Sequence, residues 1–171
     1  MQTTLRSLLQ HGSIEDLELG LHWDPAIMAD EVTRRISVLS QMGIGRGSKV
    51  AIAHSGSARF FADLFAVWTV GATAACLDRT LTSSELDTVI GFTEPAAILV
   101  DGSAPLVGFS VPILELAGHR PSPVERIFAD PLPDDPALVL FTSGTTGNPK
   151  GVVLTYGALK TRIELKYRCD R

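Results

Sequence analysis

The feature that most constrains the fold is the alternation of short apolar runs with helical patterns from about residue 25 onward. Apolar residues recur at helical spacing over 24–41, which predicts an amphipathic helix with Asp24 as N-cap and Pro25 as its first residue. The same patterns predict strands at 49–54, 72–77 and 96–100, and helices at 57–70 and 83–92, the latter starting at Ser83-Ser84. Apolar strands separated by helices indicate right-handed βαβ units, and therefore an α/β fold with a mostly parallel sheet flanked by helices.

The sequence divides into three parts, which we expect to form one truncated α/β domain over residues 1–171. Residues 1–100 hold the βα repeats. Residues 101–136 are rich in Pro and Gly and are expected to be irregular, with one short strand at 111–116. Residues 137–171 are expected to form a strand, a loop, a second strand and the start of a helix.

Composition excludes several functional classes. The chain has 15 Lys+Arg against 19 Asp+Glu, and this mildly acidic balance argues against a dedicated nucleic-acid binder. The longest uncharged apolar stretch, 64–77, is shorter than the roughly 20 residues that span a bilayer, so it predicts a buried helix and strand.

Cysteine and histidine give no sign of a metal centre. Cys76 and Cys169 lie far apart, and neither a disulfide framework nor a metal-ligand spacing follows from them. The four histidines are dispersed as well. We therefore expect no metal site built from protein ligands, and a reducing, cytoplasmic location.

One ten-residue segment, 142–151, carries a specific chemical signal. It holds four hydroxyl side chains, three glycines and one lysine, in the order Thr142, Ser143, Gly144, Thr145, Thr146, Gly147, Asn148, Pro149, Lys150 and Gly151. Glycines permit positive φ and close backbone approach, and small residues leave N–H groups uncovered, so such a loop can enclose an anion. The lysine adds a mobile positive charge. A polyphosphate, which presents many acceptors and several negative charges, suits this loop.

Other interpretations of glycine- and serine-rich segments were weighed. The loop is not a Walker A motif, because two residues separate Gly147 from Lys150. Strand-like runs at 137–141 and 152–155 flank it, which favours a hairpin; an ordinary surface turn is the alternative. Residues 43–47 follow a helix and are expected to end it, unlike a dinucleotide-binding loop. Residues 54–57 lack the glycine of a nucleophile elbow, so Ser55 or Ser57 is expected to cap the next helix.

The segment 142–152 resembles the phosphate-binding signature of the AMP-forming adenylating enzymes. This superfamily comprises the acyl-CoA and aryl-CoA synthetases, the adenylation domains of peptide synthetases, and the luciferases. Residues 42–52 and 65–72 are similar to its preceding helix–turn–strand and helix–turn segments, and the resemblance covers about 20–160. It implies the first subdomain of the large N-terminal domain of such an enzyme, ending in a strand–phosphate loop–strand hairpin.

The resemblance implies a two-step ligase reaction with ATP and Mg²⁺. A carboxylate attacks the α-phosphate of ATP to give an acyl-adenylate and pyrophosphate, and a thiol then takes the acyl group. Coenzyme A is the expected acceptor, as in fatty acid metabolism, and a carrier-protein arm is the alternative. The residues implied to bind the ATP phosphates are Thr142, Ser143, Gly144, Thr145, Thr146, Gly147 and Lys150.

The sequence departs from the family in two respects. Tyr156 stands where family members often have His, and a phenol cannot become cationic. Family members are also longer, so the catalytic lysine and the acyl pocket are expected beyond the chain end, and the isolated chain is expected to be inactive. The missing remainder of the enzyme is then a partner. The alternatives are a catalytically inactive nucleotide-binding or interaction fragment, or a complementing half of a split enzyme.

Overall fold

The computed structural model describes residues 12–54, 56–78, 80–102, 108–119, 130–142 and 150–169, without the side chains of Thr142 and of residues 166–169. Its centre is a six-stranded sheet in the order β6-β5-β3-β4-β7-β8, in which only β8 is antiparallel to its neighbour. The strands are β3 (Lys49–Ile52), β4 (Thr73–Cys76), β5 (Ala97–Leu99), β6 (Ile113–Leu114), β7 (Pro136–Thr142) and β8 (Lys150–Thr155). The expected α/β fold with a mostly parallel sheet is confirmed.

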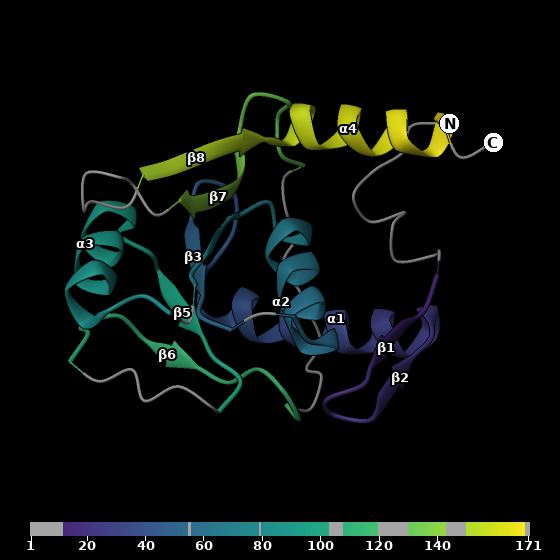
Figure 1. The fold of residues 1–171 in the computed structure, drawn as a ribbon, viewed down its shortest axis with the longest axis horizontal. Coiled ribbons are helices and arrows are strands. Elements are labelled where there is room, and N and C mark those ends of the chain that lie inside the picture. Colours follow the sequence, from purple (N-terminus) through teal and green to yellow (C-terminus); the bar gives the residue numbers. More distant parts are fainter. Residues whose placement is uncertain are drawn as a thin grey trace.

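The helices cover both faces of this sheet (Figure 1). They are α1 (Pro25–Gln41), α2 (Ala58–Thr69), α3 (Ser83–Thr93) and α4 (Tyr156–Cys169). The register places Val50, Ala74 and Leu138 on the face that packs against α1 and α2. Ala51 and Ile98 point to the opposite face, where α3 covers them. The sheet is thus the middle layer of three.

A small antiparallel pair, β1 (Ile14–Asp16) and β2 (Leu21–Trp23), precedes the first helix. The sequence pattern did not predict it, because three-residue strands are too short to show a period. Asp16 connects this pair to α2: its Oδ2 accepts the N–H of Ala58 at 3.0 Å and its Oδ1 accepts that of Leu19 at 2.9 Å. These hydrogen bonds to the charged form lower the pKa of Asp16.

Helix starts follow side-chain capping. Asp24 accepts the N–H of Ile27 at 2.9 Å and Pro25 is the first residue of α1, as predicted. Ser57 caps α2. The cap of α3 is Thr82, one residue before the predicted Ser-Ser pair. The Thr82 hydroxyl oxygen accepts the N–H of Glu85, and the Glu85 carboxylate accepts the N–H of Thr82 at 2.9 Å, which completes a capping box.

The end of α1 is a glycine-terminated turn. Gly43 has φ of 75°, and the N–H groups of Gly43 and Ile44 donate to the carbonyls of Ser40 and Leu39. This is the helix stop expected at residues 43–47, since glycine takes the left-handed conformation at low cost.

Buried polar side chains fasten α2 to β7 and α4. Trp68 donates from Nε1 to the carbonyl of Ala137 at 2.8 Å. Tyr156, 6% exposed, donates from its hydroxyl to the carbonyl of Ala72 at 2.7 Å. Burial raises the pKa of Tyr156 far above its ordinary value, with a smaller contribution from Asp135. Position 156 therefore holds a neutral phenol that anchors the start of α4 in the core.

Replacing Tyr156 with Phe tests this anchor. We expect Tyr156→Phe to lower the free energy of unfolding by about 1–2 kcal/mol, because the buried carbonyl of Ala72 loses its donor while the ring still fills its site. Urea unfolding measures the change. Thr88→Val removes the exposed hydroxyl that donates to Ser84 and should cost less than about 0.5 kcal/mol. Equal effects of the two substitutions would contradict the anchoring role.

Candidate functional site

The proposed phosphate loop connects two paired strands. β7 and β8 are antiparallel, and Thr142 lies opposite Lys150 at the open end of their ladder. The predicted hairpin is therefore present, with both ends of the loop held by backbone pairing. Of the predicted binding residues, the structure describes the backbone of Thr142 and the exposed Lys150. The others, Ser143, Gly144, Thr145, Thr146 and Gly147, lie outside the described residues.

The third glycine of the motif has a packing role. Gly151 lies directly opposite Phe141, and a Cβ at this position would be 3.3 Å from both Phe141 Cε1 and Val139 Cγ1. Its φ is not positive. From the sequence we expect backbone freedom at Gly151; the structure instead shows that the absent side chain makes room for the phenyl ring.

The hairpin opens at the carboxyl edge of the parallel strands. β3, β4, β5 and β7 run in one direction, so the residues that follow them share one edge of the sheet. His54 follows β3, Asp78 follows β4 and Asp101 follows β5. β3 and β5 are neighbours in the sheet, but the chain continues from them in opposite directions: from β3 to β4 on one side, and from β5 to β6 on the other. Ligands of open α/β sheets bind at this edge, outside such a reversal of strand order.

A buried ionic network joins α1 and α2 to the residue that follows β3. Asp63 on α2 accepts hydrogen bonds from Arg35 Nε and, at 2.7 Å, from His54 Nε2. Arg35 also pairs with Glu31 one turn earlier on α1. The side chains of Arg35, Asp63 and His54 are each at most 3% exposed. Because a carboxylate only accepts, Nε2 is the donor in this contact, and Nδ1 lies 4.0 Å from Asp101 Oδ2.

Sequence reasoning missed this network, although a signal for it exists. Arg35 shares the buried face of α1 with Val32 and Leu39. Asp63 stands between buried Ala62 and Leu64 in the predominantly apolar helix α2. Opposite charges on the core-facing sides of two successive helices are expected to pair, since neither can be buried alone.

Other titratable groups with shifted pKa values have structural roles, at both edges of the sheet. Burial raises the pKa of the Cys76 thiol to about 11, so it is unreactive at neutral pH. Hydrogen bonds from Thr80 lower the pKa of Asp78. The Arg46 guanidinium, 2.6 Å from Asp135, lowers the pKa of that carboxyl. The residues that the structure describes contain no group of three His, Cys, Asp or Glu side chains that could hold a metal ion.

Among the described helices, none combines the length and apolar character needed to cross a bilayer. The stretch 64–77 belongs to the end of α2 and to β4, as the sequence predicted. Its buried residues pack in the main core.

Comparison with known proteins agrees with the motif. Residues 26–170 match the model of a family described as AMP-binding enzyme. A hybrid PKS-NRPS synthetase, xenE of Xenoacremonium sinensis, is 36% identical over 156 residues, which cover 85% of this chain and 4% of the synthetase. The synthetase gkaA of Penicillium citrinum is 33% identical over 151 residues, again 85% of this chain and 4% of the relative.

Solved structures share the fold. The N-terminal subdomain of NpsA from Klebsiella oxytoca matches with a TM-score of 0.72 and 20% identity, over 89% of this chain and 40% of that one. The o-succinylbenzoate CoA synthetase MenE from Bacillus subtilis, in complex with its acyl-adenylate intermediate, matches with a TM-score of 0.70 and 23% identity, over 80% and 37%. The chain thus spans a small part of its curated relatives and less than half of these structures.

The buried network predicts a large effect of one substitution. Asp63→Asn should lower the free energy of unfolding by about 3 kcal/mol, because the buried Arg35 loses the carboxylate at its Nε and keeps only Glu31 as a counter-ion. Chemical denaturation monitored by circular dichroism measures the loss. The matched control is Asp135→Asn, which breaks the exposed pair with Arg46 and should cost a small fraction of that amount. Similar losses at the two positions would contradict the analysis.

Proposed function

We propose that this chain supplies the ATP phosphate-binding hairpin of a carboxylate-adenylating enzyme. The chain belongs to the AMP-binding enzyme family, and this membership supports the proposal. The observation that carries the proposal is the β7–β8 hairpin, whose strands hold Thr142 opposite Lys150 at the carboxyl edge of the sheet. The loop between them has the residue types that a polyphosphate requires. The remaining residues of the domain would complete the active site.

We assign the β- and γ-phosphates of ATP to one set of residues: Thr142, Ser143, Gly144, Thr145, Thr146, Gly147 and Lys150. Hydroxyl and backbone N–H donors suit phosphate oxygens, and the exposed Lys150 can follow the charge of the leaving group. Mg²⁺ usually binds through substrate phosphates and one or two carboxylates. Residues 142–151 contain no Asp or Glu, so the ion would reach this loop through the oxygens of the bound phosphates. When bound, it would share the phosphate charge.

The proposed chemistry needs positioning and charge neutralisation from this chain. A carboxylate oxygen bonds to the α-phosphorus while the bond from that phosphorus to the bridging oxygen breaks, and pyrophosphate leaves. Negative charge grows on the leaving group, and donors already aimed at it stabilise this change. A thiolate then attacks the acyl carbon of the adenylate and AMP departs. The catalytic lysine and the acyl pocket would come from outside this chain.

The acceptor thiol and the carboxylate are further proposals. The curated relatives are hybrid PKS-NRPS synthetases, which favours an amino acid as the carboxylate and a carrier-protein thiol in the same synthetase as acceptor. Coenzyme A, the acceptor expected from the sequence, is the second candidate, supported only by a shared fold with a CoA synthetase. Thioester formation with each acceptor, followed by mass spectrometry, separates the two.

We further propose that residues 1–171 are one incomplete domain and are inactive alone. The 40% coverage of the NpsA subdomain supports this division. An inactive nucleotide-binding or interaction fragment, or a complementing half of a split enzyme, would contain the same hairpin. Calorimetry of the isolated chain with pyrophosphate tests whether the loop binds phosphate by itself.

Exchange of labelled pyrophosphate into ATP tests the function in the complete adenylation domain. With a panel of amino and other carboxylic acids, Lys150→Ala and Gly144→Val should each slow exchange about 100-fold or more, as expected for the loss of a preorganised anion donor. Arg162→Ala, which removes an exposed cation from α4, is the control and should leave the rate unchanged. Full activity of both loop variants, or no exchange with any acid, would overturn the proposal.

A further inference from the structure

The pairing of β7 with β8 contains one extra residue on β7. Pro136 lies opposite Thr155, whereas Leu138 lies opposite Leu154. The register thus skips Ala137, which makes this position a β-bulge, with two residues of one strand against one of the other. The pairs that follow are regular up to the last residue of β7. The bulge therefore sets every pair between itself and the loop.

A register without the bulge would change the position of the loop lysine. Each residue of β8 would then lie opposite the residue of β7 one position earlier, and Lys150 would face Phe141 instead of Thr142. Since side chains alternate between the two faces of a strand, Lys150 would also turn to the other face of the sheet. Gly151 would no longer lie opposite Phe141, whose ring occupies the space of the absent side chain. The bulge thus decides on which face the lysine lies.

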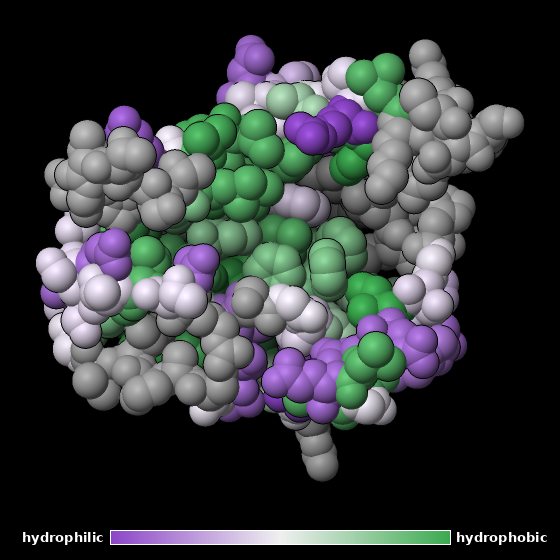
Figure 2. Space-filling view, viewed as in Figure 1, coloured by the Kyte–Doolittle hydropathy of each residue, from purple (hydrophilic) through white to green (hydrophobic). Residues whose placement is uncertain are grey.

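Hydrophobicity alone does not choose between these two registers. Val152, Val153 and Leu154 are consecutive and apolar, so a slip by one residue replaces one aliphatic side chain with another on either face. Figure 2 shows hydrophobic side chains gathered over β7 and β8. Register is strongly specified where apolar and polar residues alternate across one buried face, and this strand lacks that alternation. Other contacts must hold the bulge.

Two side chains from the connection between α2 and β4 make such contacts. Trp68, near the end of α2, donates from Nε1 to the carbonyl of Ala137 at 2.8 Å. Thr73, the first residue of β4, donates from its hydroxyl to the carbonyl of Pro136, also at 2.8 Å. All of Ala137 is buried. A bulge leaves its extra residue without a ladder partner, and a buried carbonyl without a donor is destabilising, so these two donors favour the bulged register.

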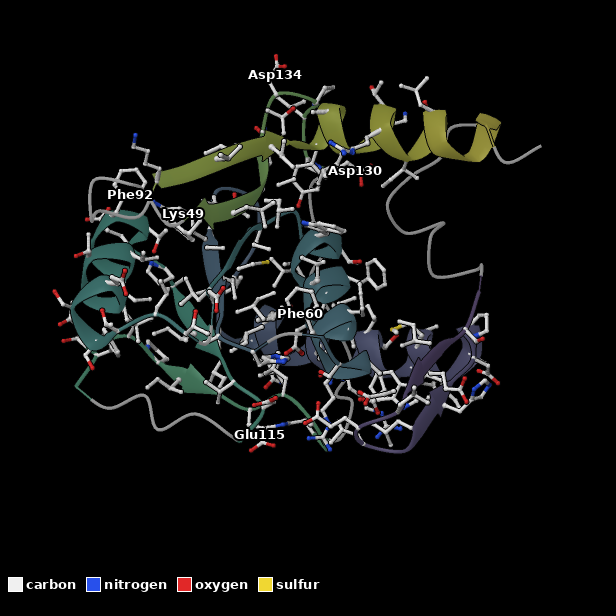
Figure 3. The ribbon with its side chains drawn as sticks, in the orientation of Figure 1. Lys49, Phe60, Phe92, Glu115, Asp130 and Asp134 are labelled. Carbon is white, nitrogen blue, oxygen red and sulfur yellow. The ribbon has the colours of Figure 1, made fainter. Side chains whose placement is uncertain are left out.

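The end of the hairpin away from the loop is fixed as well. The N–H of Tyr156 donates to the carbonyl of Asp135 at 3.0 Å, and the N–H of Gly157 donates to that of Pro133 at 2.8 Å. Figure 3 shows Asp134, in the same turn, near the junction of β8 with α4. Because the start of β7 and the end of β8 are held together here, the bulge determines the register at the loop.

We propose that Trp68 and Thr73 are positioning residues of the phosphate loop, which hold the bulge at Ala137 and thereby fix Lys150 opposite Thr142. They act through the strand register and not by contact with ATP. Their effect on ATP rests on the proposed function, whereas their effect on the register does not. A cation displaced by one residue changes its face of the sheet, so ATP binding depends on the register.

Pyrophosphate exchange in the complete adenylation domain tests the effect on ATP. Trp68→Phe and Thr73→Val each remove one donor and should raise the KM for ATP about fivefold or more, with the KM for the acid within about twofold. Thr73→Ser keeps the hydroxyl and should leave the KM for ATP unchanged, although valine is the better strand former. The matched control is Phe65→Leu, which alters packing beside Trp68, at 6.0 Å between ring centroids, and should also leave it unchanged.

Cross-strand disulfides report the register without any activity. Val139→Cys with Val153→Cys joins positions that face each other in the observed register, whereas Val139→Cys with Val152→Cys joins positions that face each other after the slip. Peptide mass spectrometry measures both products after oxidation of the complete domain. We expect the first pair alone in the otherwise unmodified domain, and a gain of the second pair when Trp68→Phe or Thr73→Val is added.

Three results would overturn the proposal. They are a KM for ATP that Trp68→Phe and Thr73→Val leave unchanged, an equal rise with Thr73→Ser or Phe65→Leu, and a disulfide pattern that neither donor variant alters. If Trp68→Phe does not fold, the comparison of Thr73→Val with Thr73→Ser decides. An unmodified domain that exchanges pyrophosphate with no acid would overturn the proposed function, and the disulfides would then decide the register by themselves.

Discussion

The pairing of β7 with β4 is the interaction on which the rest of the structure depends. It joins Leu138 to Ala74 and Leu140 to Cys76, across about sixty residues of intervening chain. Such a distant contact costs loop entropy, so it must be stabilised by more than backbone bonds. Once made, it adds β8 to the sheet and brings the ends of the loop to the edge where β3, β4 and β5 also end. Every proposed contact with phosphate follows from this one junction.

Three buried polar contacts secure that junction. The indole of Trp68 and the hydroxyl of Thr73 both donate to carbonyls at the start of β7. The hydroxyl of Tyr156 donates to the carbonyl of Ala72. Each donor reaches a carbonyl from an element distant in sequence, so each bond fixes the relative position of two elements. The buried, neutral phenol at position 156 therefore has a structural role in this chain.

Prediction from the sequence succeeded where the signal is local and failed where it is not. Asp24 and Pro25 located the first residue of α1, and the run before residue 142 located β7, because caps and apolar runs act over a few residues. The cap at Thr82, the β1–β2 pair and the packing role of Gly151 each depend on a reciprocal partner that a linear pattern does not display. The Arg35–Asp63–His54 network required knowing which helix faces meet. The phosphate-binding role of the loop stays a prediction from composition and order, because residues 143–149 lie outside the described structure.

One antiparallel pair holds both ends of the proposed phosphate loop. β8 begins at Lys150 and pairs along its length with β7, and β7 is itself paired with β4. Among the described strands β8 is the last of the sheet, so its backbone pairs on one side only. The position of Lys150 opposite Thr142 therefore depends on β7, and through β7 on the hydrogen bonds that Trp68 and Thr73 donate to its first residues.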